Sequence, residues 1–529
     1  MPVKPSHPMS IFEPSITRRQ LLLLAGAAGG SSIVPAFSGT LKPLAGKSNP
    51  AEFFYRPEGA WAADFIPLYA NGKFQLFFLL DWRDVAGHGE GTPWYRVSTV
   101  DFVNFKEHGE VLSRGSTRDQ DLYVFTGSVI QAKDGFHIFY TGHNPHLRDQ
   151  GKPEQAVMHA VSQDLNRWTK RAQDTFFAPT DKYEKDNWRD PFVFWNEEEK
   201  QYNMLLAARV KQGIPRRRGV TLLCTSTDLA TWHVQEPFYA PNLYYAHECP
   251  DLFRMGDWWY FIFSEFSDKA RTRYRMSRSL QGPWLTPRRD DFDGHAFYAA
   301  KSASDGKNRF LFGWNPTRNG SKDDGEWEWG GNLVVHELIQ ENDGELGVKV
   351  PQSIAASFGK AAVPVSFESG VGAFQYDQGV LRLDARDTFA AAVAGPQPRV
   401  CRIHAKAQFQ QGTEEFGLMF RTSGDLNNSY YIKIEPQAGR LVFDLWPKKR
   451  WGQIPHIVEL ERSIDLSTSD TVALTVLIDG NMGVAYLNDT IAMSFRAYDL
   501  VEGNWGFFAN DGRVSFSDID IRVGAVDRG

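Results

Sequence analysis

The stretch FIPLYANGKFQLFFLL, residues 65–80, places two apolar segments on either side of Asn71-Gly72. Asn-Gly between apolar, aromatic runs is a strong short-range signal for a β-hairpin, because both residues tolerate the positive φ of a tight turn. The stretch therefore predicts a strand over 65–70, a turn, and a second strand over 73–80.

Four further stretches repeat this arrangement. Their first strands are expected over 128–132, 192–195, 252–255 and 297–302, and their second strands over 136–141, 201–208, 258–264 and 309–314. Turn residues such as Asp134-Gly135 and Asp305-Gly306 separate the members of each pair. Five all-β units with almost no helical periodicity between residues 50 and 350 predict a five-bladed β-propeller.

A second signature, Asp-apolar-x-x-aromatic, follows three of these hairpins. It begins at Asp101, Asp164 and Asp228, with a degraded copy at Leu280 and Trp284. An Asp at the start of a loop caps its backbone, and the aromatic residue then packs between sheets. We therefore assign these aspartates a structural role.

From about residue 367 to 523 the pattern changes to plain alternating strands separated by turn signals such as Asp479-Gly480. This pattern predicts a single β-sandwich. The boundary is expected in the weakly patterned stretch 351–363. The predicted division is an export signal over 1–38, a propeller over 50–355 and a sandwich over 364–525.

The first forty residues resemble an export signal. Arg18-Arg19 precede an apolar run over 21–28, and Ala36-Phe37-Ser38 offers a small-x-small cleavage site. Paired arginines before a modest apolar stretch are typical of a twin-arginine signal. The alternative is an uncleaved anchor, but the run is short for a bilayer. We expect cleavage and a mature protein, periplasmic or extracellular, without a membrane span.

The composition narrows the class of partner. Aromatic residues make up 14% of the chain, with 16 tryptophans, and such rings pack well against the C–H face of a sugar. A net charge of -6 argues against nucleic acid, and three cysteines cannot build a disulfide framework. No metal-ligand spacing or phosphate-binding glycine loop appears, so no cofactor is expected. The sequence does not specify the oligomeric state.

Carboxylates recur at the repeat period. The residues at or just before the five first strands are Asp64, Ser128, Asp190, Glu248 and Tyr298. In a propeller the innermost strands line one axis, so these positions are expected to converge. Glycoside cleavage needs two facing carboxylates, one to attack or to activate water and one to protonate the leaving oxygen. A third can stabilise the charge that develops on the sugar ring.

The motifs around these positions resemble a known family. Trp61-Ala-Ala-Asp64, Phe125-Thr-Gly-Ser128, Trp188-Arg-Asp190-Pro and Glu248-Cys-Pro-Asp251 occur in the order seen in glycoside hydrolase family 32, the invertase, levanase and inulinase group. Phe297-Tyr-Ala, Gly313-Trp314 and Trp329-Gly-Gly-Asn-Leu are also similar to that family. The resemblance covers roughly residues 52–352 and extends weakly into the sandwich.

The resemblance implies roles for individual residues. Asp64 would be the nucleophile, Glu248 the general acid and then base, and Asp190 the stabiliser of the transition state. Arg189 would bind sugar hydroxyls. Further substrate contacts are expected from the residues Trp61, Phe125, Ser128, Trp82 and Trp314. Blade packing is the alternative for each of these aromatics, and for Trp314 it is the favoured one.

Two neighbours of Glu248 are interpreted as structural residues. Cys249 and His247 could pair as nucleophile and base, but a buried thiol and a hydrogen-bonding histidine are the better interpretations. The run Arg216-Arg217-Arg218 could meet an anionic sugar, although a solvated loop is the default.

The sequence also departs from the family pattern. The family usually has Asn before the nucleophile and Pro-Asn-Gly after it, whereas this chain has Ala63 and then Phe65-Ile66-Pro67. Leu79-Leu80-Asp81 stands where the family prefers Gln and Asn, and His336 where it often has Arg. These changes predict retained chemistry with an altered sugar-binding shell.

The favoured function is a retaining hydrolase of β-fructofuranosidic bonds in fructans or fructo-oligosaccharides. The alternatives are a fructosyltransferase, an inverting arabinan- or xylan-type glycosidase on the same fold, and a carbohydrate-binding protein with a decayed site. The sandwich shows no catalytic constellation. Its Trp446, Trp451 and Trp505 could hold polysaccharide, but core packing is the better reading of each.

Overall fold

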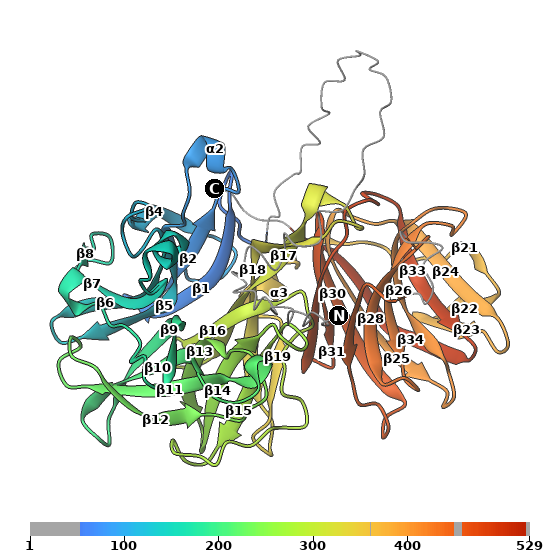
Figure 1. Cartoon of the computed structure of the whole chain (residues 1–529). Coiled ribbons are helices and arrows are strands. Elements are labelled where there is room, and N and C mark those ends of the chain that lie inside the picture. Colours follow the sequence, from blue (N-terminus) through green and yellow to red (C-terminus); the bar gives the residue numbers. More distant parts are fainter. Residues whose placement is uncertain (1–52, 360, 449–456, 525–529) are drawn as a thin grey trace, which may run out of the picture.

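The computed structural model describes residues 53–359, 361–448 and 457–524, and nearly all regular structure in these ranges is β-strand (Figure 1). The predicted export signal over 1–38 and Trp451 lie outside the described residues. The α-helices are α2 (Val85–His88) and α3 (Gln352–Ser357), and single 3-10 turns span Pro145–Gln150, Ala172–Asp174, Pro215–Arg217 and Asn319–Ser321. Within the described ranges, no helix is long and apolar enough to cross a membrane.

The strands up to β19 form antiparallel sheets. One eight-stranded sheet contains β1 (Trp61–Ala70), β2 (Lys73–Asp81), β3 (Trp94–Thr99), β4 (Lys106–Leu112), β16 (Tyr298–Ser304), β17 (Arg309–Arg318), β18 (Trp327–Gln340) and β19 (Leu346–Lys349). A four-stranded sheet contains β5 (Tyr123–Ala132), β6 (Gly135–His143), β7 (Gln155–Ser162) and β8 (Thr169–Lys170). The next contains β9 (Tyr183–Asn196), β10 (Gln201–Val210), β11 (Gly219–Ser226) and β12 (His233–Tyr239). A three-stranded sheet contains β13 (Glu248–Met255), β14 (Trp258–Glu265) and β15 (Arg271–Ser277).

The five predicted hairpins are confirmed as the adjacent pairs β1–β2, β5–β6, β9–β10, β13–β14 and β16–β17. In the first, Asn71 and Gly72 have φ values of 55° and 71°, as the tight turn requires. Ala62 of β1 pairs with Gly331 of β18, which joins the first and last groups of strands into one sheet. The sheets alone therefore do not establish the predicted count of five blades.

The Asp-apolar-x-x-aromatic segments form loops after β3, β7 and β11. Asp228 Oδ1 accepts hydrogen bonds from the backbone N–H groups of Ala230 (2.9 Å) and Thr231 (2.8 Å), and these bonds lower the pKa of Asp228 to about 2. Leu229 is buried with a φ of 63°, and Trp232 packs edge-on against Phe139 at 5.4 Å. The predicted structural role of these aspartates is confirmed.

The first strand of each hairpin carries a β-bulge, which lies near the strand's beginning except in β9, where it lies mid-strand. The register shifts in β1, β5, β13 and β16 fall after Ala63, Phe125, Glu248 and Tyr298, and β9 shifts between Arg189 and Phe192. The residues with positive φ at these bulges are Asp64 (48°), Asp190 (61°), Cys249 (52°) and Ala299 (53°). Because a bulge re-aims side chains, these sites decide which carboxylates meet.

The remaining strands form two sheets packed face to face. The eight-stranded sheet contains β20 (Ala361–Ala362), β22 (Ala373–Asp377), β23 (Val380–Asp384), β25 (Val400–Phe409), β30 (Thr471–Asp479), β31 (Met482–Leu487), β32 (Ile491–Arg496) and β34 (Arg513–Val523). The seven-stranded sheet contains β21 (Ser369–Val371), β24 (Phe389–Pro396), β26 (Glu415–Thr422), β27 (Ser429–Glu435), β28 (Arg440–Trp446), β29 (Leu460–Ser463) and β33 (Asn504–Asn510).

Apolar side chains fill the space between these two sheets, as a sandwich requires. Phe443 and Phe495 stack there with ring centroids 4.8 Å apart. Trp505 is buried in the same core, as expected, whereas the exposed fraction of Trp446 is 39%. The core-packing prediction is therefore confirmed for Trp505 and wrong for Trp446, which is the last residue of β28 and stays partly exposed.

The sandwich packs directly on the β1–β19 part of the chain (Figure 1). The Val348 N–H donates to the Thr490 carbonyl at 3.0 Å. The buried carboxylate of Asp293 lies 3.0 Å from His336 Nε2 and accepts from the Ser494 N–H at 2.7 Å. Both parts thus contribute partners to one buried polar contact.

Candidate active site

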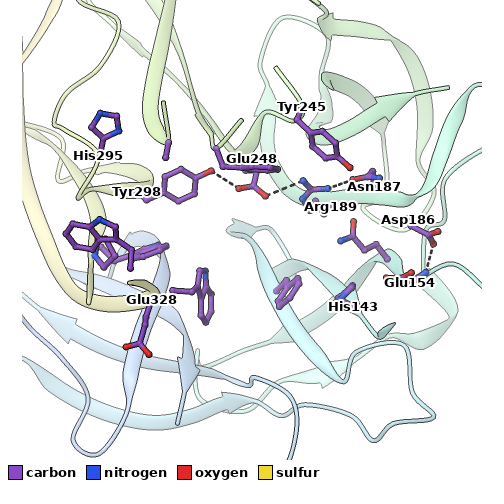
Figure 2. Close-up of a pocket in the computed structure, with 18 of the residues that line it drawn as sticks. His143, Glu154, Asp186, Asn187, Arg189, Tyr245, Glu248, His295, Tyr298 and Glu328 are labelled. Atoms are coloured by element: carbon purple, nitrogen blue, oxygen red, sulfur yellow. Dashed lines mark hydrogen bonds and ion pairs between the residues drawn. The ribbon is translucent and has the colours of Figure 1, made fainter. Parts of the chain in front are cut away.

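A pocket of about 480 Å³ opens beside the bulged ends of the first strands (Figure 2). This volume suits a small saccharide, and aromatic walls with a few polar groups are typical of ligand sites. Its lining comprises Phe125, His143, Arg148, Glu154, Gln155, Asp186, Asn187, Arg189, Tyr245, Glu248, Phe266, Ala270, His295, Tyr298, Trp314, Pro316, Trp327, Glu328, Trp329, Glu459 and Leu460.

Of the three carboxylates predicted to be catalytic, Glu248 lines this pocket, and two donors hold it. Tyr298 Oη donates to Glu248 Oε2 at 2.8 Å, and Arg189 Nη2 donates to Glu248 Oε1 at 3.2 Å (Figure 2). The glutamate is 2% exposed. Arg189 is itself fixed, since Nη1 donates to Asn187 Oδ1 at 3.0 Å. Glu248 is therefore oriented toward the cavity by groups that are themselves oriented.

Asp190 lies behind this pair. Its Oδ2 accepts from the Cys249 N–H at 2.9 Å, and its own N–H donates to Thr141 Oγ1 at 2.7 Å. Arg189 Nε is 4.0 Å from the same carboxylate oxygen. Cys249, the residue after Glu248, thus links the two carboxylates through its backbone.

Asp64 is fully buried and is not itself among the pocket-lining residues. The indole Nε1 of Trp314 donates to Asp64 Oδ1 at 3.1 Å, and Trp314 lines the pocket. The packing role favoured for Trp314 is thus incomplete, because this tryptophan both packs in the core and reaches the proposed nucleophile.

The repeat register of the predicted trio needs a correction. Asp64 and Asp190 occupy equivalent positions, since both have positive φ at the bulge. In β13 and β16 that position is held by Cys249 and Ala299, so Glu248 and Tyr298 lie one residue earlier. A shift of one residue in a strand turns a side chain to the other face. Glu248 is therefore grouped with Arg189 and Tyr298, with which it forms hydrogen bonds.

The six predicted substrate contacts divide into two groups. Arg189, Phe125 and Trp314 line the pocket, and Phe125 stacks on His143 with ring centroids 4.8 Å apart. Ser128 does not line it, because its Oγ accepts from the Val193 N–H at 2.9 Å between β5 and β9. Ser128 therefore has a structural partner rather than a place in the pocket.

Trp61 and Trp82 also lie outside the pocket lining. The guanidinium groups of Arg56 and Arg83 lie over the Trp61 ring at 4.4 and 4.6 Å. Trp82 stacks on His88 at 4.9 Å with parallel planes. Protein groups thus engage both rings, and sugar contacts by Ser128, Trp61 and Trp82 stay predictions.

The structure agrees with the structural roles predicted for His247 and Cys249, the two neighbours of Glu248. His247 is fully buried, with Nδ1 3.2 Å from Thr221 Oγ1, and burial lowers its pKa to about 3. Such a histidine is neutral and is shielded from substrate. Cys249 is a buried thiol, and its Sγ lies 3.8 Å from Asp190 Oδ2. No cluster of three or more potential metal ligands occurs among residues 53–359, 361–448 and 457–524.

Several pocket residues were not predicted as site residues. Tyr298 had a signal, because it occupies the fifth repeat position. Tyr245, His143, Trp327 and Glu459 had none, since loops and a distant strand bring them to the pocket. Trp329 belonged to a motif similar to the family, but its place on the pocket wall follows only from the fold.

Comparison with known proteins decides the family. The N-terminal domain of glycosyl hydrolases family 32 matches residues 55–347, and the C-terminal domain of that family matches residues 381–523. The chain belongs to glycosyl hydrolases family 32. It is accordingly a glycoside hydrolase, similar to β-fructofuranosidases, and the predicted resemblance is confirmed.

Relatives of established activity match most of the chain. The raffinose invertase of Escherichia coli is 25% identical over 475 residues, covering 84% of this chain and 89% of that protein. The sucrose-6-phosphate hydrolase of the same organism is 24% identical over 474 residues, covering 85% and 89%. The levanbiose-producing levanase of Bacillus subtilis is 25% identical over 254 residues, covering 44% and 42%.

Solved structures show the same fold. Fructan 1-exohydrolase IIa from Cichorium intybus superposes with a TM-score of 0.68 at 16% identity, covering 90% of this chain and 98% of that one. Sucrose-6-phosphate hydrolase from Lactobacillus gasseri gives a TM-score of 0.67 at 17% identity, covering 91% and 94%. The all-β class is thereby confirmed together with the combination of propeller and sandwich.

Proposed function

We propose that this protein is a retaining glycosidase that cleaves β-fructofuranosidic bonds in fructans or fructo-oligosaccharides. The carrying observation is Glu248, a nearly buried carboxylate that lines a saccharide-sized pocket between two orienting donors. The family membership supports the fructoside class, as does the activity named for its relatives.

The proposed reaction has two displacements. Asp64 attacks the anomeric carbon while Glu248 gives a proton to the departing glycosidic oxygen, so the bond to the leaving group breaks as the bond to Asp64 forms. Water then attacks the same carbon, Glu248 takes its proton, and the bond to Asp64 breaks. Asp190 stabilises the positive charge on the ring through its hydroxyls. The sugar binds beside Trp314, which lines the pocket and donates to Asp64.

The substrate is proposed to be neutral rather than phosphorylated. The two arginines that line the pocket both have acidic partners: Arg148 pairs with Glu154, and Arg189 with Glu248. Asp186, Glu328 and Glu459 add further negative charge to the lining. Phosphate recognition relies on cations directed at the ligand, whereas acidic side chains accept hydrogen bonds from sugar hydroxyls.

The shell around Asp64 supports an unusual fructoside. Ala63 and Phe65 flank Asp64, and both are fully buried. Neither residue has a side-chain amide, whereas the family pattern has one before the nucleophile. A neutral fructoside whose recognition depends less on that amide fits this arrangement.

Three organisational proposals accompany the function. The eight-stranded sheet that contains β1 comprises two blades that share one edge. Together with the three sheets formed by β5–β15, this gives five blades in all. The chain divides into propeller and sandwich within 351–363, because strands up to β19 and from β20 onward pair separately.

Residues 1–38 direct export, so Arg18→Lys together with Arg19→Lys should abolish recovery of the protein outside the cytoplasm. Equal export of this double variant would exclude the twin-arginine route.

The test uses the purified protein, an Asp64→Asn variant and an Asp425→Asn control on the sandwich surface. Each is incubated with sucrose, sucrose 6-phosphate, raffinose, inulin, levan and arabinose- or xylose-based furanosides, and the anomer first released is identified by NMR. We expect fructose of retained configuration from the neutral substrates, and at least about 1,000-fold slower release by Asp64→Asn, because the nucleophile is lost.

Other outcomes select the alternatives. Inverted configuration would favour a single displacement, and transfer of fructose to sugar would favour a fructosyltransferase. Cleavage of arabinose- or xylose-based furanosides alone would contradict the fructoside proposal. Binding without cleavage by the wild-type protein would favour a carbohydrate-binding role. A preference for sucrose 6-phosphate would contradict the neutral substrate.

A further inference from the structure

The sandwich contributes directly to the wall of the pocket. Glu459 and Leu460, at the start of β29, line the cavity together with Trp327 and Glu328 at the start of β18. Leu460 is only 4% exposed and packs in the sandwich core, so its position is fixed. One side of the pocket is therefore built from two parts of the chain that are about 130 residues apart.

A buried arginine holds β29 against the propeller on one side. Arg462, 1% exposed, donates through Nη2 to the Asp291 carbonyl at 2.7 Å and to Asp291 Oδ1 at 2.9 Å. Arg271 pairs with the same carboxylate, and its Nη2 lies 3.3 Å from Nε2 of the pocket residue His295. The position of β29 is thus coupled to the loop that carries His295 into the pocket (Figure 2).

A second ion pair holds the other side. Arg318 Nη2 donates to Glu459 Oε2 at 2.8 Å, and the Arg318 guanidinium lies 4.1 Å from the centre of the Trp327 ring. Asp323, in the loop between β17 and β18, accepts from Tyr430 Oη at 2.6 Å and from the Tyr498 N–H at 2.8 Å. The sandwich therefore fixes the loop between β17 and β18. Trp327 and Glu328, which line the pocket, follow directly after this loop.

We propose that Glu459, Leu460 and Trp327 form a subsite for the second neutral sugar unit beyond the bond that is cleaved, a unit that longer substrates carry and sucrose lacks. This inference rests on the proposed function. The partly buried Trp327 indole offers apolar surface to the C–H face of a sugar, and the Glu459 carboxylate accepts hydrogen bonds from its hydroxyls. Leu460, fixed in the sandwich core, anchors this wall of the pocket. The sandwich thereby selects substrates by length and does more than support the propeller.

The test compares Glu459→Gln with Glu461→Gln. Glu461 lies two residues further along the chain, pairs with Arg440 at 2.8 Å and does not line the pocket. Values of kcat/KM are measured for sucrose, 1-kestose and inulin, with the unfolding temperature of each variant as a folding check. Glu459→Gln keeps the side-chain shape and removes the charge.

We expect Glu459→Gln to lower kcat/KM by about tenfold for the longer substrates, because one hydrogen bond to a charged group is lost. For sucrose we expect kcat/KM to fall by less than about twofold. Glu461→Gln should leave all values unchanged. An equal loss of kcat/KM on every substrate would mean that Glu459 has only a structural role. No loss of kcat/KM on any substrate would mean that Glu459 does not contact the sugar. Either result overturns the proposal. Turnover of sucrose by the wild-type protein tests the proposed function separately, so the two can fail independently.

Discussion

Tyr298 is the clearest positioning residue for Glu248, because its hydroxyl donates to the carboxylate oxygen at 2.8 Å. Tyr298→Phe removes this one donor and keeps the ring. A hydrogen bond to a charged group contributes about 1.5–3 kcal/mol, so kcat should fall by about tenfold or more, with a smaller change in KM. Steady-state kinetics on sucrose measure both. Tyr69→Phe, at an exposed position outside the pocket, is the control, and an unchanged kcat in Tyr298→Phe would dismiss this role.

His247 makes stability depend on pH. Burial, with a smaller effect from Arg275, lowers its pKa from 6.5 to about 3. Between these values the unfolded chain binds a proton that the folded protein excludes, so this contribution to stability is complete above pH 6.5 and is lost as the pH falls toward 3. His247→Gln does not titrate. Urea unfolding at pH 7 and pH 5 should therefore show a smaller drop for the variant than for the wild type, and equal drops would refute the prediction.

Repeats and motifs in the sequence mark Asp64, Asp190, Glu248 and Arg189 as site residues, and their roles in catalysis and sugar binding stay predictions. The sequence missed the shift of Glu248 by one residue, since the bulge that creates the shift depends on backbone angles that no residue type specifies. It also did not predict the two cation–π contacts of the Trp61 ring. The nearby guanidinium groups come from Arg56 and Arg83, and only the fold brings Arg83 to that ring.

At the level of elements, the bulges leave little room for added atoms. A Cβ on Gly127, at the bulge of β5, would lie 1.8 Å from the carbonyl oxygen of Phe139. Gly127→Ala should therefore force the two strands apart and lower the free energy of unfolding by about 1–3 kcal/mol. Gly395→Ala, where no atom lies within 4 Å, is the matched control. Denaturant unfolding of both variants checks this, and equal stabilities would mean that the bulge relaxes freely.

The inner hairpins were predictable because apolar runs and turn residues define them locally. The outer strands were not. In β12, His233, Gln235 and Glu236 are exposed to solvent, and β8 contains only Thr169 and Lys170. Such strands lack the alternating pattern that marks a half-buried strand, and pairing with a neighbour is what orders them.

At the level of the whole molecule, buried polar contacts join the propeller and the sandwich. Arg462 donates to the carbonyls of Ala492 and Asp291 and to the Asp291 carboxylate. Arg462→Met leaves these acceptors buried without that donor, which should cost about 3 kcal/mol or more. In calorimetry we expect a lower unfolding temperature and a separation of the two parts into distinct transitions. Arg386→Met, on the exposed surface, is the control, and a single unshifted transition in Arg462→Met would contradict the coupling.

The sequence by itself determined the all-β class, the hairpins, the sandwich and the trio of acidic residues, because each depends on residue spacing or on local turn chemistry. The tertiary structure decided which side chains share the pocket. Leu460 and Glu459 reach it from the sandwich, and Trp314 reaches Asp64 across 250 residues of sequence. Such contacts depend on how sheets close and pack, and interactions between residues far apart in the chain leave no periodic signal in the sequence.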